Sequence, residues 1–259
     1  MDTIFNPELF HTVEISMAIL AVIVFIALQK IEAAYGMTYS PKWGPSLGNR
    51  IGWIVMEAPA FFGMAAIWAA SPRASETAPC VMALLFELHY FQRTFIFPML
   101  MRGKNRMPLA IVAMGMIFNL INAYLLGGWL FFAAPADRYP VSWLGSPQFI
   151  IGAIVFFTGM VINIHSDHVI RSLRKPGDNG HYIPRRGLYR YVTGANYFGE
   201  FTEWTGFAIL TWSVPGAVFA LWTFANLAPR AKSLYAKYEK RFGPEFTSLG
   251  RKYIIPFIY

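Results

Sequence analysis

Charged residues and cysteine are scarce in this sequence, and each shortage excludes a class of protein. Only 14% of the 259 residues are charged and 56% are hydrophobic, whereas an ordinary soluble domain has about 25% charged residues. A single cysteine, Cys80, allows no intrachain disulfide, and five histidines are too few for a membrane di-iron site built from several histidine motifs. This composition excludes a soluble globular domain and predicts a membrane protein.

The usual nucleotide-binding and metal-binding motifs are also missing. The sequence contains no G-x-G-x-x-G and no Walker motif, so arginines and amides of a helical bundle would have to hold any nucleotide. His165 and His168 form an H-x-x-H pair, but two histidines without a third ligand at a plausible spacing do not define a zinc site. We therefore expect neither a Rossmann domain nor a metal.

Apolar runs long enough to cross a membrane divide the chain. A hydrocarbon core of ~30 Å requires about 20 apolar residues. Five such runs lie near residues 9–29, 51–71, 77–100, 108–133 and 147–170. Between Arg190 and Arg230 the only charged residues are Glu200 and Glu203. This stretch is too long for one span, and a turn at 213–216 divides it into two. We predict an all-α, polytopic membrane protein with seven transmembrane helices.

The positions of Lys and Arg predict the orientation, because cytoplasmic loops hold most of these residues. With the N-terminus outside, the 22 Lys and Arg fall in cytoplasmic loops and the tail except Arg73 and Arg138, which lie outside, and Arg93 within a span. Topology thus explains the net charge of +8, and we expect no nucleic-acid partner. We expect a lumenal or outside N-terminus and a cytoplasmic C-terminus, in a bacterial inner membrane or the endoplasmic reticulum.

Glu57 lies a third of the way along the second span, where the membrane makes an ionisable residue costly. A charge at the bilayer centre costs about 2.5–3.5 kcal/mol, so such residues usually serve a site. No basic residue lies within six positions of Glu57, so a neighbouring helix must supply its partner. One interpretation is a structural hydrogen bond between helices. The other is a protonated carboxyl that donates a hydrogen bond to a substrate.

The third span carries Glu87, His89, Tyr90 and Arg93 within seven positions. A phenol can donate a hydrogen bond to a carbonyl oxygen without first acquiring a charge, so Tyr90 is a candidate for substrate binding. For Glu87 and His89 the competing interpretation is an internal ion-pair network that orders the bundle.

A polar stripe marks the end of the fifth span. Asn163, Asp167, Arg171 and Arg174 follow a spacing of four, four and three, which places them on one helix face. A solvated helix end explains only the two arginines. A stripe two to three turns deep instead suits an elongated, polyanionic ligand that enters from the cytoplasm.

The sixth and seventh spans add further candidates. Asn196 and Glu200, four residues apart, offer the donors and acceptors that a nicotinamide carboxamide or a ribose requires. We expect Glu203 to pair structurally. Arg230 and Tyr238 share a face at the end of the last span, where a snorkelling arginine is the alternative interpretation.

Several segments together resemble the steroid 5α-reductase family. They are residues 88–94, 159–167, 173–177, 194–200 and 255–259. The resemblance runs from about Trp53 to Tyr259, with the helices in the same order. It implies a membrane reductase, one domain of seven helices over residues 1–259, that uses NADPH to reduce the Δ4 double bond of 3-oxo steroids such as testosterone or progesterone to 5α-dihydro steroids. We expect a monomer that takes a steroid or another apolar enone from the bilayer.

The resemblance also assigns roles to residues. It implies that Glu57 and Tyr90 are catalytic and hydrogen-bond the 3-oxo group. The implied cofactor contacts are Arg93, Asn163, Asp167, Arg171, Arg174, Asn196, Glu200, Arg230 and Tyr238. The implied lining of the substrate cavity is Trp53, Phe118 and Trp222, although such aromatic residues also serve packing. Residues 51–133 would thus form the substrate side, and residues 147–259 the cofactor side.

Two positions depart from the pattern of vertebrate members. Tyr182 stands where they have an arginine, and Leu234 where they have a histidine. Arg185 and Arg186 are candidates to replace the lost charge. Because cations select the extra phosphate of NADPH, the departures leave the choice between NADPH and NADH open and favour a bacterial or other non-vertebrate member.

Other functions share some of these features. Polyprenol and enoyl-thioester reductases share the C-terminal motifs, and methyltransferases of prenylated cysteine have a similar basic C-terminal half. A transporter would use Glu57, Glu87 and Asp167 as a polar path. The polar stripe, however, reaches only the cytoplasmic side, so transport ranks behind these enzymes.

Overall fold

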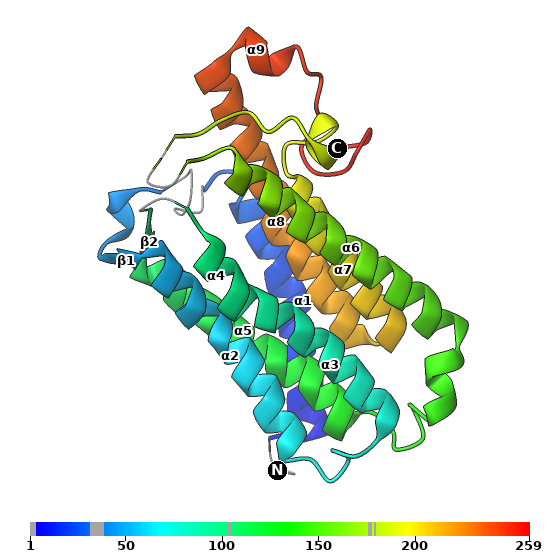
Figure 1. Ribbon diagram of the computed structural model, residues 1–259. Helices are drawn as coiled ribbons and strands as arrows, with labels where there is room; N and C mark the ends of the chain where they lie inside the picture. The colour runs from blue at the N-terminus through cyan, green and yellow to red at the C-terminus, as the bar shows by residue number, and fades with distance from the viewer. Residues whose placement is uncertain (1–3, 32–38, 103–104, 176–177, 179) are drawn as a thin grey trace.

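The computed structural model is a bundle of long helices that run side by side (Figure 1). It describes residues 4–31, 39–102, 105–175, 178 and 180–259. Pro176 and Gly177, of the segment 173–177, and Lys104 lie outside the described residues.

Helices occupy every predicted apolar run. The long helices are α1 Pro7–Ala27, α2 Asn49–Ala69, α3 Thr77–Phe91, α5 Leu109–Gly128, α6 Pro147–Ser172, α7 Ala195–Thr211 and α8 Val214–Phe242. The π-helical turn η3 (Gln92–Ile96) joins α3 to α4 (Phe97–Leu100), and η4 (Trp129–Ala133) extends α5. Short helical turns are η2 Pro41–Trp43, η5 Val141–Gly145, η6 Gly187–Arg190 and α9 Pro244–Thr247.

Two short strands depart from the all-α expectation. β1 (Ser46–Gly48) pairs antiparallel with β2 (Arg106–Pro108), with Leu47 opposite Met107. They lie directly before α2 and α5, and these two helices pack together. The ribbon therefore ties the starts of two neighbouring helices.

Side-chain caps explain where several helices begin. The Asn6 side chain accepts hydrogen bonds from the first turn of α1, and the Ser146 and Ser213 hydroxyls do the same for α6 and α8. Each of these helices has a proline in its first two positions, where a missing N–H costs nothing. Ser213 thus starts α8 at the predicted turn.

In the described part of the chain, four helical segments are long and apolar enough to cross a membrane. They are Pro7–Ala27, Asn49–Ala69, Leu109–Ala133 and Pro147–Ser172. Of the other long helices, α3 and α7 have 15 and 17 residues, and α8 has basic residues in its last turn. Passage of these three through the membrane stays a prediction.

Glycines bring α6 and α7 into backbone contact. A Cβ at Gly159 would overlap the backbone of Glu203, and one at Gly199 would overlap the backbone of Asn163. Small residues let membrane helices approach closely because no side chain separates their backbones. Gly199 lies directly before Glu200, so this contact sets Asn163 beside the polar face of α7.

Candidate active site

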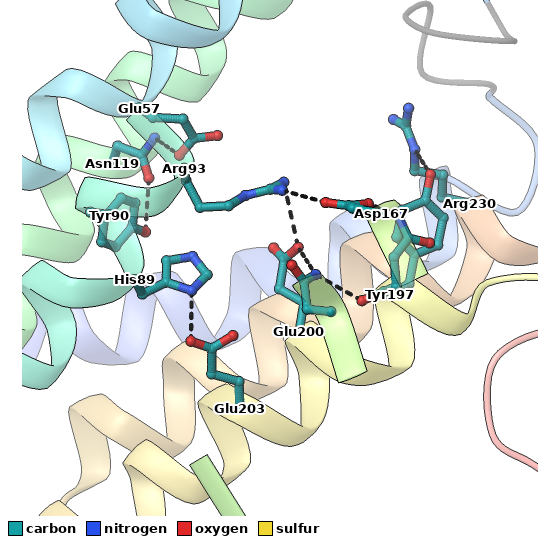
Figure 2. Close-up of polar contacts among 12 residues, drawn as sticks. Glu57, His89, Tyr90, Arg93, Asn119, Asp167, Tyr197, Glu200, Glu203 and Arg230 are labelled. Atoms are coloured by element: carbon teal, nitrogen blue, oxygen red, sulfur yellow. Dashed lines mark hydrogen bonds and ion pairs between the residues drawn. The ribbon is translucent and has the colours of Figure 1, made fainter. Parts of the chain in front are cut away.

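Glu57 and Tyr90 lie on different helices and meet through one amide from a third helix (Figure 2). Asn119 on α5 donates through Nδ2 to Glu57 Oε2 on α2 over 3.2 Å. Tyr90 on α3 donates its hydroxyl proton to Asn119 Oδ1, also over 3.2 Å. The carboxyl and the phenol are therefore held at one place in the bundle, and Asn119 is the partner that a neighbouring helix supplies to Glu57.

A backbone carbonyl fixes the direction of these hydrogen bonds. Asn119 Nδ2 lies 2.7 Å from the carbonyl oxygen of Met56, which can only accept. The amide oxygen of Asn119 must then face Tyr90, so the phenol has to donate to it. Asn122, one turn further along α5, donates to the phenol oxygen over 3.1 Å.

Sequence reasoning missed Asn119 and Asn122. Both are buried, at 4% and 3% exposure. Their signal was two amides three residues apart within the apolar run 108–133, where an unpaired polar group is costly. That spacing places both on one helix face.

Arg93 connects this cluster to the helices on the other side of the bundle. Its guanidinium lies 3.3 Å from Asp167 and 3.6 Å from Glu200, and its side chain extends toward them from the side of Tyr90 in Figure 2. The same group stacks on the rings of Trp53 and Phe97, 4.8 and 4.5 Å from their centroids. Arg93 lies in the π-helical turn η3, a distortion that is frequent at functional sites.

Amides and carboxylates of α6 and α7 surround the far end of Arg93. Asn196 donates to Asp167 over 3.2 Å. Asn163 donates to the carbonyl oxygen of Asn196 over 2.9 Å and lies 3.5 Å from Glu200. The structure therefore brings five of the predicted cofactor residues into one network.

Of the two residues considered for an internal ion-pair network that orders the bundle, His89 has such a partner. Its Nδ1 lies 2.8 Å from Glu203 on α7, and both residues are buried. Neither carboxyl oxygen of Glu87 has a hydrogen-bond partner in the described part of the chain. Glu203 thus has a structural partner as expected, and the pair ties α3 to α7 next to Tyr90.

The other four predicted cofactor residues are Arg171, Arg174, Arg230 and Tyr238. Arg174 donates to the carbonyl oxygen of Gly180, and Arg230 donates to the Tyr197 hydroxyl, both over 2.7 Å. Tyr238 donates to the carbonyl oxygen of Tyr182 over 3.3 Å. Arg171, in the last turn of α6, is partly exposed. Arg174, Arg230 and Tyr238 thus have partners outside the Arg93 network, at the end of the bundle where α6 ends and α7 begins, which is its polar end. Arg171 interacts electrostatically with Asp167 and so borders the network.

The loop after α6 carries titratable groups near Arg174. Gly180 N and the Tyr182 hydroxyl donate to Asp178, and these bonds hold the pKa of that carboxyl below its usual value and raise the pKa of Tyr182. Burial lowers the pKa of His181, and Arg174 and Arg241 lower it further. A phosphate that approached His181 would favour its protonated form.

Arg251 is a buried cation that sequence reasoning did not select. It is 6% exposed, and it donates through Nη2 to the carbonyl oxygen of Pro184 over 2.6 Å. Its Nε and Nη1 have no hydrogen-bond partner among the described residues, and burial lowers its pKa to about 10. Two buried, unused donors on a cation fit an anionic ligand.

The three aromatic residues predicted to line a substrate cavity fall in two places. Phe118 and Trp222 pack with ring centroids 5.1 Å apart, and Trp222 donates to the carbonyl oxygen of Met17 over 2.7 Å. Trp53 instead belongs to a cluster with Met56 and stacks on Arg93. Only Trp53 borders the Arg93 network.

Comparisons with known proteins place the chain in a family. The family described as 3-oxo-5-alpha-steroid 4-dehydrogenase matches residues 105–259. The chain is 41% identical over 240 residues to 3-oxo-5-alpha-steroid 4-dehydrogenase 1 of Homo sapiens, with 91% of this chain and 90% of that protein covered. It is 36% identical over 240 residues to Steroid 5-alpha-reductase DET2 of Arabidopsis thaliana, with 90% of each covered. The resemblance predicted from the sequence is confirmed, and the chain belongs to the steroid 5α-reductase family of oxidoreductases.

Proposed function

We propose that this protein reduces the Δ4 double bond of 3-oxo steroids with NADPH, and that Glu57 and Tyr90 bind the 3-oxo group. The observation that carries the proposal is the cluster of Glu57, Asn119 and Tyr90, next to the Arg93 network. A carbonyl-binding pair thus borders a set of amides, carboxylates and cations that suits a nucleotide. The relatives named as 3-oxo-5-alpha-steroid 4-dehydrogenases and steroid 5-alpha-reductases support the same reaction.

Reduction of a conjugated enone places negative charge on its carbonyl oxygen. When bound, the reduced nicotinamide supplies the hydride that the β carbon receives. Donors aimed at the carbonyl oxygen stabilise this charge most in the transition state. Asn119 occupies Glu57 Oε2, which leaves Oε1 of the protonated acid to donate. Tyr90 turns its proton from Asn119 to the substrate, and the α carbon takes a proton from Tyr90 or water.

The residues present fit a reduced nucleotide. Asn163, Asn196 and Glu200 offer donors and acceptors for a carboxamide or a ribose. At the polar end, Arg251 has two buried donors without partners, and His181 Nε2 is likewise buried and unpartnered in the described part of the chain. With Arg174 and Arg171 they would hold the phosphates, and the number of cations there favours NADPH over NADH.

The fold also supports seven spans with a cytoplasmic C-terminus. α1 begins at one end of the bundle and α8 ends at the other (Figure 1), as an odd number of crossings requires. Arg102, after α4, donates to the backbone carbonyls of Arg171 and Arg174. Basic loops that are distant in sequence thus meet at one end, as expected of a cytoplasmic face.

Single-turnover reduction by the purified protein tests the proposed function. Testosterone and progesterone are mixed with the protein and NADPH, with NADH in a parallel reaction, and the products are identified by mass spectrometry. We expect 5α-reduced steroid with NADPH. Binding of NADPH without a steroid product would redirect the proposal to polyprenols or enoyl thioesters. Failure to bind NADPH would overturn it and favour a methyltransferase or a transporter.

A further inference from the structure

The outer face of α6 changes from apolar to polar near its C-terminal end. Ile150, Ile154, Phe157, Val161 and His165 are spaced four, three, four and four residues apart, so they share one helix face. The four apolar side chains are between 44% and 65% exposed, and His165 is exposed as well. α6 is one of the helices apolar enough to cross a membrane. This face therefore meets lipid tails, and His165 marks the level where headgroups begin.

A cavity of about 420 Å³ opens at this level between α6 and η6. Its polar side chains are His165, Ser166, Arg190 and Tyr191. Among the described residues that line it, none carries a carboxylate. The cavity thus presents a cation and several donors without an acid to neutralise them.

The cavity is separate from the nucleotide-binding residues of α6. Asn163 and Asp167 point toward α7 and are buried, whereas His165 is exposed on the opposite side of the helix. Gly187 has a φ of +58°, and a Cβ there would lie 2.5 Å from the His165 ring. Glycine therefore lets η6 approach His165 and form the wall of the cavity.

Apolar side chains border the same opening. The ring of Tyr191, which lines the cavity, lies 5.1 Å from the ring of Phe257. Phe257 and Ile258 are each 76% exposed. Exposed aromatic and aliphatic side chains beside a cation are typical of the boundary between lipid tails and headgroups.

We propose that this cavity binds the phosphate group of an anionic membrane phospholipid. Arg190 supplies the charge, and His165 and Tyr191 donate hydrogen bonds to the phosphate oxygens. The acyl chains lie along the exposed apolar face of α6, which leads directly to His165. This continuity favours a lipid phosphate over a free phosphate ion, which would gain nothing from the apolar face.

Native mass spectrometry of the delipidated, detergent-purified protein tests the proposal. The protein is titrated with phosphatidylglycerol and, separately, with phosphatidylcholine of the same chain length. We expect one phosphatidylglycerol to bind more tightly than phosphatidylcholine. Arg190→Gln should weaken phosphatidylglycerol binding about fivefold, the effect of one basic residue near a membrane surface, and Arg190→Lys should restore most of it.

Arg186→Gln is the matched control, because it removes the same charge from an exposed position in the same loop that does not line the cavity. If Arg190 alone contributes the binding free energy of about 1 kcal/mol, Arg186→Gln should change phosphatidylglycerol binding less than twofold. Equal binding of the two lipids by the wild type, or equal losses in Arg190→Gln and Arg186→Gln, would overturn the proposal. Binding of inorganic phosphate as tight as that of phosphatidylglycerol would show a phosphate site instead, and would overturn the lipid assignment.

Discussion

The phenol of Tyr90 donates its proton to the amide oxygen of Asn119 over 3.2 Å. The same amide holds Glu57 through its nitrogen. One side chain therefore sets the position of both groups proposed to bind the substrate.

Replacing Asn119 should impair turnover more than replacing Asn122. Asn119→Leu removes the partner of Glu57 and the acceptor of the Tyr90 proton, whereas Asn122→Leu removes only a donor to Tyr90. A buried polar group left unpaired costs about 1–3 kcal/mol, so both variants should unfold at a lower temperature. Steady-state kinetics should show a lower kcat with an unchanged KM for cofactor in Asn119→Leu. Equal kcat values for the two variants would contradict a role for Asn119 in holding Glu57.

Removing either proposed donor should slow the reaction without weakening cofactor binding. Loss of one donor to a developing oxyanion typically lowers turnover by about 10²–10³. We expect losses of this order for Glu57→Leu and Tyr90→Phe, measured by single-turnover product formation. Glu57→Gln should lose less, because its Nε2 still donates to a carbonyl oxygen. The dissociation constant for NADPH, measured by fluorescence titration, should stay within about twofold, since roughly 0.4 kcal/mol is within the scatter of distant substitutions. Wild-type turnover in both variants would refute the assignment.

A methyl group at the contact of α6 and α7 should disturb the cofactor site. The Cβ of Gly199→Ala would overlap the backbone of Asn163, and overpacking costs about 1–3 kcal/mol. We expect a lower unfolding temperature and weaker NADPH binding, because Asn163 shifts away from Glu200. Gly145→Ala is the control, since a Cβ there meets nothing within 4 Å. If both variants behave alike, the close contact does not position the site.

Arg251 should contribute to the binding of phosphate. A hydrogen bond to a charged group is worth about 1.5–3 kcal/mol, so Arg251→Gln should raise the dissociation constant for NADPH at least about tenfold. Lys252→Gln, at the neighbouring exposed position, removes the same charge and serves as the control. Calorimetric titration of both variants measures the difference. Equal effects would mean that Arg251 acts only through net charge.

His181 should make the stability of the free protein depend on pH. Burial lowers its pKa below the usual 6.5, so below pH 6.5 the unfolded chain takes up a proton that the folded protein resists. The free energy of unfolding should therefore fall as the pH is lowered from 6.5 through the pKa of the folded state. Thermal unfolding at several pH values should show this fall in the wild type and a smaller one in His181→Gln. The same slope in both proteins would exclude His181 as its source.

The apolar runs were sufficient to predict the helices. Hydrophobic length alone placed α6 within a few residues of its bounds, and Ser213 marked the break between α7 and α8. Periodicity also predicted that Asn163 and Asp167 share a face, and they meet the same network. These properties are local, because helix formation and membrane burial depend on neighbouring residues of one segment.

The pairing of polar residues depended on the tertiary structure. His89 pairs with Glu203 on α7 and not within its own helix, and the partner of Glu57 is Asn119 on α5. Which side chains meet depends on how the helices cross and how closely they approach, and glycines such as Gly199 set that distance. The sequence alone determined which polar residues lie within apolar runs, where the membrane makes an unpaired polar group costly. The packing of the helices decided which of these residues meet, because a hydrogen bond requires its two atoms to approach within about 3 Å.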